Sequence, residues 1–158
     1  MKTSKPILLA VAFISSAMLG AGLYVQFVEK MLPCPWCIIQ RYIFAAIAII
    51  CLITAFLPAR FTRMGAGAGM LAAITGMGAA IWLLWVQAHP GLSCGIDPLE
   101  TSLNKVFTAE LLPFLFKADG LCTTEYPPIL GLSVPLWALV WFTIFAVASG
   151  WAAFKRSR

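Results

Sequence analysis

Two cysteines separated by two residues lie between two long apolar stretches, in the segment Cys34-Pro-Trp-Cys37. Pro35 suits the first position of a helix, because its missing N–H needs no partner there and its φ is already helical. We therefore expect Cys34 at the cap of a helix and Cys37 in its first turn. The unpaired N–H groups and the positive end of the helix dipole favour a thiolate at this place. The pair is predicted to form a redox site.

Arg41 follows Cys37 by four residues. In a helix this spacing puts the two side chains on the same face, one turn apart. A fixed positive charge there favours the thiolate form of Cys37. The competing interpretation of Arg41 is an anchor that reaches the lipid headgroups, but the neighbouring cysteines favour a functional role.

The elements that carry these residues are predicted to be membrane-spanning helices. The chain has 158 residues, of which 61% are hydrophobic and only 11% charged. A helix needs about 20 apolar residues to cross a bilayer, and stretches of that order occur at about 7–28, 38–57, 65–88 and 135–154. The fold class is therefore an all-α integral membrane protein, a bundle of four transmembrane helices forming a single membrane domain over 1–158.

The first apolar stretch is longer than the about 7–15 residues of a signal-peptide core, so we expect an uncleaved helix there. The net charge of +5 is interpreted as membrane orientation, since no Gly-rich phosphate loop and no basic-aromatic patch is present. We expect the lipid bilayer as a partner and no nucleic acid.

The helices leave two loops on the side of the cysteine pair, 29–37 and 89–134. The second loop carries Cys94 and Cys122. Apolar residues recur at helical spacing between Leu103 and Leu115. They predict a short amphipathic helix that lies on the bilayer surface and that Pro113 breaks or ends.

The basic residues predict the orientation, because they gather on the cytoplasmic side of a membrane protein. With both termini and the turn around Arg60 inside, seven of the eleven basic residues are cytoplasmic: Lys2, Lys5, Arg60, Arg63, Lys155, Arg156 and Arg158. All six acidic residues then lie outside, together with Cys34, Cys37, Cys94 and Cys122. Disulfides persist in that compartment.

Two cysteine pairs on one side of the membrane could form two structural disulfides, a four-thiolate metal site or a redox relay. A structural zinc site normally uses two close pairs, whereas only Cys34 and Cys37 are close here, so we expect no metal. A Cys-x-x-Cys at a helix start favours exchange over inert stapling. The alternative is a non-catalytic membrane protein with two disulfide-stapled outer loops. Cys51 is left alone in an apolar stretch, as a small buried residue.

The four apolar helices, Cys34-Pro-Trp-Cys37 followed by Gln40-Arg41, and a cysteine pair in the second outer loop resemble the DsbB family. Its members are quinone-linked disulfide oxidases of the bacterial inner membrane. The resemblance covers essentially the whole chain. The vitamin K epoxide reductase fold is a lesser match, because its loop cysteines precede its Cys-x-x-Cys and this chain has the opposite order.

The resemblance implies a multi-pass protein of the cell inner membrane and a path for two electrons. A periplasmic DsbA-like oxidase of thioredoxin fold would attack a Cys94–Cys122 disulfide at Cys94. The freed Cys122 would exchange with Cys34, which leaves Cys37 to face a quinone, either ubiquinone or menaquinone. Arg41 and His89, the single histidine, are the residues implied to bind the quinone. For His89, a solvated helix end is an equal alternative.

Overall fold

The structure is a computed structural model that describes residues 4–89, 91, 98–123 and 126–154. In these residues the chain is all-helical. Four long helices, α1 (Ser4–Phe27), α2 (Pro35–Phe56), α3 (Ala59–Ala88) and α7 (Val134–Phe154), are each long and apolar enough to cross a membrane. Three short helices, α4 (Pro98–Asn104), α5 (Phe107–Leu111) and α6 (Pro113–Phe116), lie between α3 and α7 in the sequence. The predicted fold class, with four spans, is confirmed.

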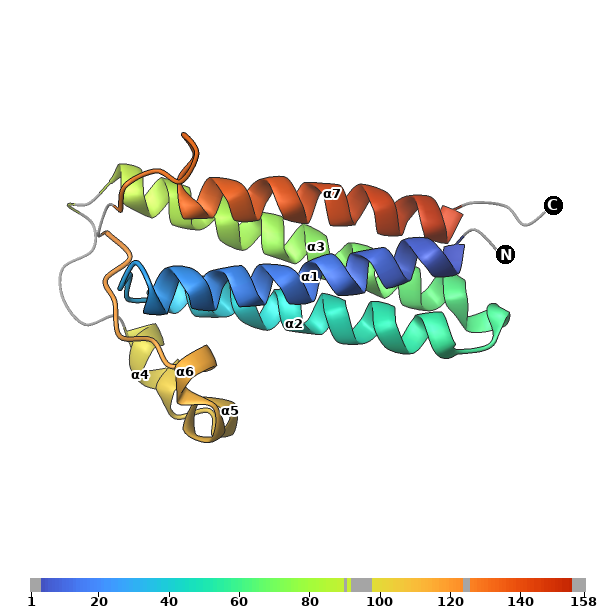
Figure 1. Ribbon diagram of the computed structural model, residues 1–158, viewed down its shortest axis with the longest axis horizontal. Coiled ribbons are helices and arrows are strands. Elements are labelled where there is room, and N and C mark those ends of the chain that lie inside the picture. Colours follow the sequence, from blue (N-terminus) through green and yellow to red (C-terminus); the bar gives the residue numbers. More distant parts are fainter. Residues whose placement is uncertain (1–3, 90, 92–97, 124–125, 155–158) are drawn as a thin grey trace.

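The four long helices lie side by side in an elongated bundle (Figure 1), in which α3 packs along α7 and α2 packs along both α1 and α3. Aromatic rings fill its middle: Phe44 of α2 stacks on Phe142 of α7, with ring centroids 4.2 Å apart. Gly76 of α3 makes room for this pair, because a Cβ there would lie 2.6 Å from the Phe142 ring. The small residue allows the two helix backbones to approach closely, as is typical of helices packed in lipid.

One end of the bundle carries the start of α1, the end of α7 and the α2–α3 turn; we call it the terminal end (Figure 1). Basic side chains bind carbonyl groups there. Lys5 donates to the Leu57 carbonyl (3.2 Å) and Arg63 to the Ala153 carbonyl (3.2 Å). The third helix begins at Ala59, earlier than the expected 65, with Pro58 at its N-cap. Pro58 thus both ends α2 and precedes α3, so the turn is shorter than the sequence suggested.

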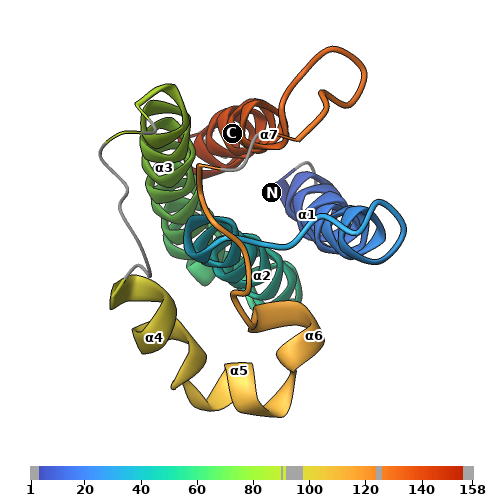
Figure 2. The same cartoon turned by 90° about the vertical axis from the view of Figure 1, so that its left-hand side faces the viewer.

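The opposite end, which we call the cysteine end, carries the α1–α2 connection and the short helices. These helices, α4 to α6, lie beside the outer part of α2 (Figure 2). The sequence predicted one amphipathic helix here, and the structure has three short ones because the chain turns before Phe107 and again at Pro113, which begins α6. Ile38 of α2 is fully buried against Ala109, Phe116 and Ala118.

Candidate active site

The Cys-x-x-Cys segment forms the start of α2, as the sequence predicted. Cys34 is the N-cap residue and Pro35 occupies the first turn. The Cys37 N–H donates to the Cys34 sulfur (3.4 Å), so the cap itself orients the two side chains toward each other. The two Sγ atoms lie 3.0 Å apart as thiols. This arrangement places a dithiol at the positive end of a membrane-spanning helix, where thiolates are favoured.

Cys122 lies next to Cys34. The two are buried in one small apolar cluster with Leu83, and Trp36, Cys37 and Val86 pack against it. A hydrogen bond with Cys122 raises the pKa of the Cys34 thiol, and the bond with Cys37 and burial act in the same direction. Cys34 is therefore the middle sulfur of three. Cys94, the fourth predicted site cysteine, lies outside the described residues.

Arg41 is buried in the next turn of α2 and joins three elements. Its Nη1 donates to the Gln26 side-chain oxygen (2.7 Å) and to the Leu115 carbonyl (3.0 Å), and its Nη2 donates to the Gly22 carbonyl (3.1 Å). The guanidinium also interacts electrostatically with Cys37 and Cys34. The anchor interpretation required this side chain to extend toward the lipid headgroups, whereas it is buried and hydrogen-bonded inside the protein.

A family model described as "Disulfide bond formation protein DsbB" matches residues 4–152 of the chain. The chain belongs to the DsbB family. It is 58% identical over 156 residues to the disulfide bond formation protein B of Herminiimonas arsenicoxydans, covering 99% of both chains. It is 42% identical to that of Cupriavidus metallidurans, covering 98% of this chain and 96% of the relative. A "Disulfide bond formation protein B 2" of Burkholderia lata is 43% identical, with coverage of 91% and 85%.

DsbB is a thiol:quinone oxidoreductase that reoxidises DsbA and passes the electrons to quinone, so this is the activity of the chain. It is a multi-pass membrane enzyme. The enzyme class expected from the cysteine pattern is confirmed, and the non-catalytic alternative is not supported.

The residues beside Cys37 fit a DsbB quinone. A quinone offers two carbonyl oxygens, which only accept hydrogen bonds. Gln40, one turn from Cys37, is buried, and its Nε2 has no hydrogen-bond partner among the described residues. Arg41 carries five N–H donors, more than the three hydrogen bonds described for it. A bound quinone would supply an acceptor of two electrons and two protons, and Gln40 and Arg41 would be the donors for its carbonyl oxygens.

The sequence pattern assigns Gln40 no role beyond its place in the motif with Arg41. The available signal was its position three residues after Cys37, which places an amide on the face that carries the thiol. His89, by contrast, does not join Arg41. It is exposed at the end of α3, where its ring stacks on Trp85 at 4.7 Å and Nδ1 contacts the Trp85 carbonyl at 2.9 Å.

Proposed function

We propose that the two cysteine pairs of this DsbB act as a relay, in which Cys94 and Cys122 accept electrons from the thioredoxin-like partner and Cys34 and Cys37 deliver them to quinone. The observation that supports this order is the position of Cys34 between Cys37 and Cys122. A sulfur with a neighbouring sulfur on either side can exchange one disulfide bond for the other with little movement. Such proximity replaces a bimolecular encounter with an intramolecular step.

The relay begins at a Cys94–Cys122 disulfide. A partner thiolate attacks the Cys94 sulfur, so that a partner–Cys94 bond forms and Cys122 leaves as a thiolate. Cys122 then attacks Cys34 of the Cys34–Cys37 disulfide; the Cys34–Cys122 bond forms and Cys37 leaves as a thiolate. The thiol of lower pKa leaves faster in disulfide exchange. Because the pKa of the Cys34 thiol is raised, Cys34 is a poor leaving group, which favours attack at Cys34 and release of Cys37.

The second half of the relay returns the loop to its oxidised form. The second thiol of the partner attacks the mixed disulfide, and Cys94 is released while the partner leaves oxidised. Cys94 then attacks Cys122, which restores the Cys94–Cys122 bond and leaves Cys34 and Cys37 as a dithiol. The pair then holds the two electrons and two protons that the partner lost.

Cys37, Gln40 and Arg41 form the proposed quinone site. Their positions along α2 place them on one helical face. Arg41 supplies a positive charge that stabilises both the Cys37 thiolate and negative charge on a quinone oxygen. His89 is proposed as a further hydrogen-bonding group at the same end of the bundle. The proposed quinone is ubiquinone or menaquinone, because these donors fit the carbonyl oxygens that both rings share.

The proposed location is the bacterial inner membrane, with the terminal end cytoplasmic and the cysteine end periplasmic. The described basic residues of the terminal end, Lys5, Arg60 and Arg63, support this orientation by the positive-inside rule. In this orientation the thiols face an oxidising compartment. Reporter fusions after Arg63 should read cytoplasmic, and a periplasmic reading there would contradict the orientation.

The relay is tested by mixing purified protein, quinone and a reduced DsbA-like dithiol protein, and following quinone absorbance. Cys37→Ser should abolish quinone reduction. Cys94→Ser should block oxidation of the partner yet leave the Cys34–Cys37 pair oxidisable by quinone. Cys51 is a buried thiol remote from the cysteine end, so Cys51→Ser should change neither quinone reduction nor oxidation of the partner. Variants that fold normally and keep full turnover without Cys94 or Cys37 would contradict the relay.

A further inference from the structure

The α1–α2 connection and the segment after α6 are bound to each other by backbone groups. The Pro33 carbonyl accepts hydrogen bonds from the N–H groups of both Asp119 and Gly120, each at 3.1 Å. Because these bonds involve the main chain, they fix the path of the chain just before Cys34 and just before Cys122, independently of most side chains.

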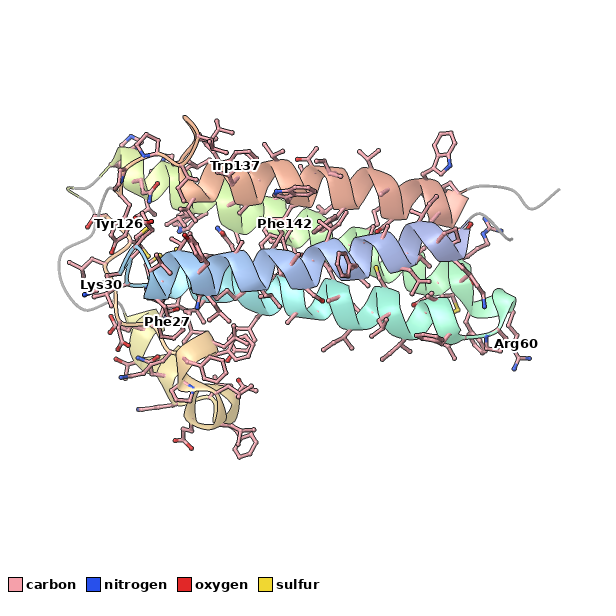
Figure 3. The ribbon with its side chains drawn as sticks, viewed as in Figure 1. Phe27, Lys30, Arg60, Tyr126, Trp137 and Phe142 are labelled. Carbon is pink, nitrogen blue, oxygen red and sulfur yellow. The ribbon has the colours of Figure 1, made fainter. Side chains whose placement is uncertain are left out.

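Tyr126 holds the same connection from the other side of Cys122. Its hydroxyl accepts from the Leu32 N–H (3.1 Å) and donates to the Leu32 carbonyl (3.4 Å). Figure 3 shows Tyr126 at the cysteine end, beside the connection that contains Lys30. Cys122 thus lies between two attachment points on residues 32 and 33, one at Asp119 and Gly120 and one at Tyr126.

Gly120 is required by the closeness of this contact. A Cβ at Gly120 would lie 2.4 Å from the Leu32 carbonyl oxygen and 2.9 Å from its carbon, against 3.4 Å or more for an ordinary contact. The two nearest atoms are main chain and the third is the Leu32 Cβ at 3.1 Å, which is fixed to the main chain, so no flexible side-chain end can move aside. The φ of Gly120 is not in the left-handed region, so the requirement for glycine comes from space alone.

The stretch before Gly120 is also fixed. The Asn104 side chain donates to the Ala118 carbonyl (2.9 Å) and accepts from the Ala118 N–H (2.8 Å). Phe116 stacks on Tyr42 of α2 at 4.2 Å. The chain therefore has little freedom between Ala118 and Gly120, the residue in contact with Leu32, and Cys122 follows two residues later.

We propose that Gly120 and Tyr126 are positioning residues, which bind the second loop to the α1–α2 connection and thereby hold the Cys122 sulfur at Cys34. This rests on the proposed relay. The step they serve is the attack of the Cys122 thiolate on Cys34, in which the Cys34–Cys122 bond forms, the Cys34–Cys37 bond breaks and Cys37 takes the electron pair. Neither residue takes part in the chemistry.

The first measurement needs no partner and no quinone. In a Cys37→Ser, Cys94→Ser background, Cys34 and Cys122 are the remaining pair at the cysteine end, and a glutathione redox buffer gives their effective concentration. Adding Gly120→Ala should lower it about tenfold or more, the factor that a loss of 1.4 kcal/mol produces. Tyr126→Phe removes both hydrogen bonds to Leu32, and it should lower the effective concentration by at least the about 2–12-fold that one neutral hydrogen bond is worth.

The second measurement uses the full enzyme. Turnover driven by the reduced thioredoxin-like protein should fall in both variants, whereas single-turnover oxidation of the prereduced Cys34–Cys37 pair by added quinone should not change. Matched controls are Gly78→Ala, where an added Cβ meets nothing within 4 Å, and Tyr24→Phe, an exposed tyrosine near the same end. Both controls should keep both rates.

Three results would overturn the proposal: an unchanged effective concentration in both variants, an unchanged partner-driven rate in both, or equal losses in the partner-driven and quinone-driven reactions. The last would indicate a general structural role. If Gly120→Ala fails to fold, Tyr126→Phe decides alone. If the wild-type enzyme does not oxidise the partner through the loop, the relay fails, and the effective concentration still shows whether these residues position Cys122.

Discussion

The middle of the bundle and the cysteine end are held together by different kinds of contact. In the middle, Phe44 and Phe142 stack beside Gly76, and the helices meet mainly through apolar surface, with a buried hydrogen bond from Ser15 to the Phe44 carbonyl (2.9 Å). At the cysteine end, the short helices and the loop are attached through directed hydrogen bonds, such as those of Arg41 and Asn104. Apolar packing tolerates small displacements, whereas a hydrogen bond fails when its geometry changes. The enzyme therefore uses directed contacts where sulfur atoms must meet.

The largest effect is expected for Arg41, which belongs to the proposed quinone site and also binds the Leu115 carbonyl of α6. Loss of a charge-assisted hydrogen bond costs about 1.5–3 kcal/mol, or about 10–150-fold. Arg41→Gln should therefore insert normally but need about 10–150 times more quinone for half-maximal rate, by steady-state kinetics. Arg41→Lys should be intermediate, because lysine keeps the charge and loses the planar fork.

The control for Arg41 is Arg60→Gln at the terminal end, where the guanidinium lies over the Phe61 ring at 4.8 Å. It should leave the quinone dependence unchanged. If Arg41→Gln also leaves it unchanged, Arg41 serves only to join α1, α2 and α6 through Gly22, Gln26 and Leu115.

A change in the middle of the bundle should affect stability and not the relay. Gly76→Ala places a methyl group 2.6 Å from the Phe142 ring, and overpacking of this kind costs about 1–3 kcal/mol. The thermal midpoint should fall, while the ratio of partner-driven to quinone-driven rates stays constant in the folded fraction. A changed ratio would show that the bundle packing and the cysteine end are coupled.

The contrast between the middle of the bundle and the cysteine end also explains how much of the structure the sequence could predict. Helix starts and apolar spans depend on neighbouring residues, so Pro35 and the spacing of Cys34 and Cys37 were enough to place the dithiol at the cap of α2. The contact of Cys34 with Cys122 depends on chain segments far apart in sequence. Its supports are main-chain groups of Leu32 and Pro33, which no side-chain pattern encodes.

Arg41 illustrates the limit for a single residue. Its spacing from Cys37 predicted the correct helical face, but two of its acceptors are carbonyl oxygens, of Gly22 and Leu115. Carbonyl groups occur at every position, so the sequence could not show which would bind it. The start of the third helix was predicted too late, at 65, because Pro58 was interpreted only as the end of α2. The fixed φ of Pro58 also permits the next helix to begin at Ala59.

A smaller effect is expected for Gln40, whose substitution should affect protein stability and quinone binding differently. Its buried Nε2 has no partner within the described residues, so Gln40→Leu should not lower the stability of the quinone-free protein, measured by thermal unfolding. The same change removes a donor from the proposed quinone site and should raise the quinone needed for half-maximal rate by about 2–12-fold. A loss of stability without a change in quinone dependence would place Gln40 in the structure alone.

The smallest effect is expected for the ionisation of Cys34. It tests whether a single hydrogen bond at the cysteine end, between Cys34 and Cys122, controls this thiol. The hydrogen bond that the Cys34 thiol makes with Cys122 is the largest cause that raises the Cys34 pKa. A raised pKa means less thiolate at a given pH, so alkylation of Cys34 should require more alkaline pH than alkylation of a free cysteine. In a Cys37→Ser background, Cys122→Ala removes that cause and should move the alkylation curve of Cys34 back toward lower pH. Mass spectrometry of the labelled peptide measures both curves, and a curve that does not move would mean that burial, not Cys122, controls the Cys34 thiol.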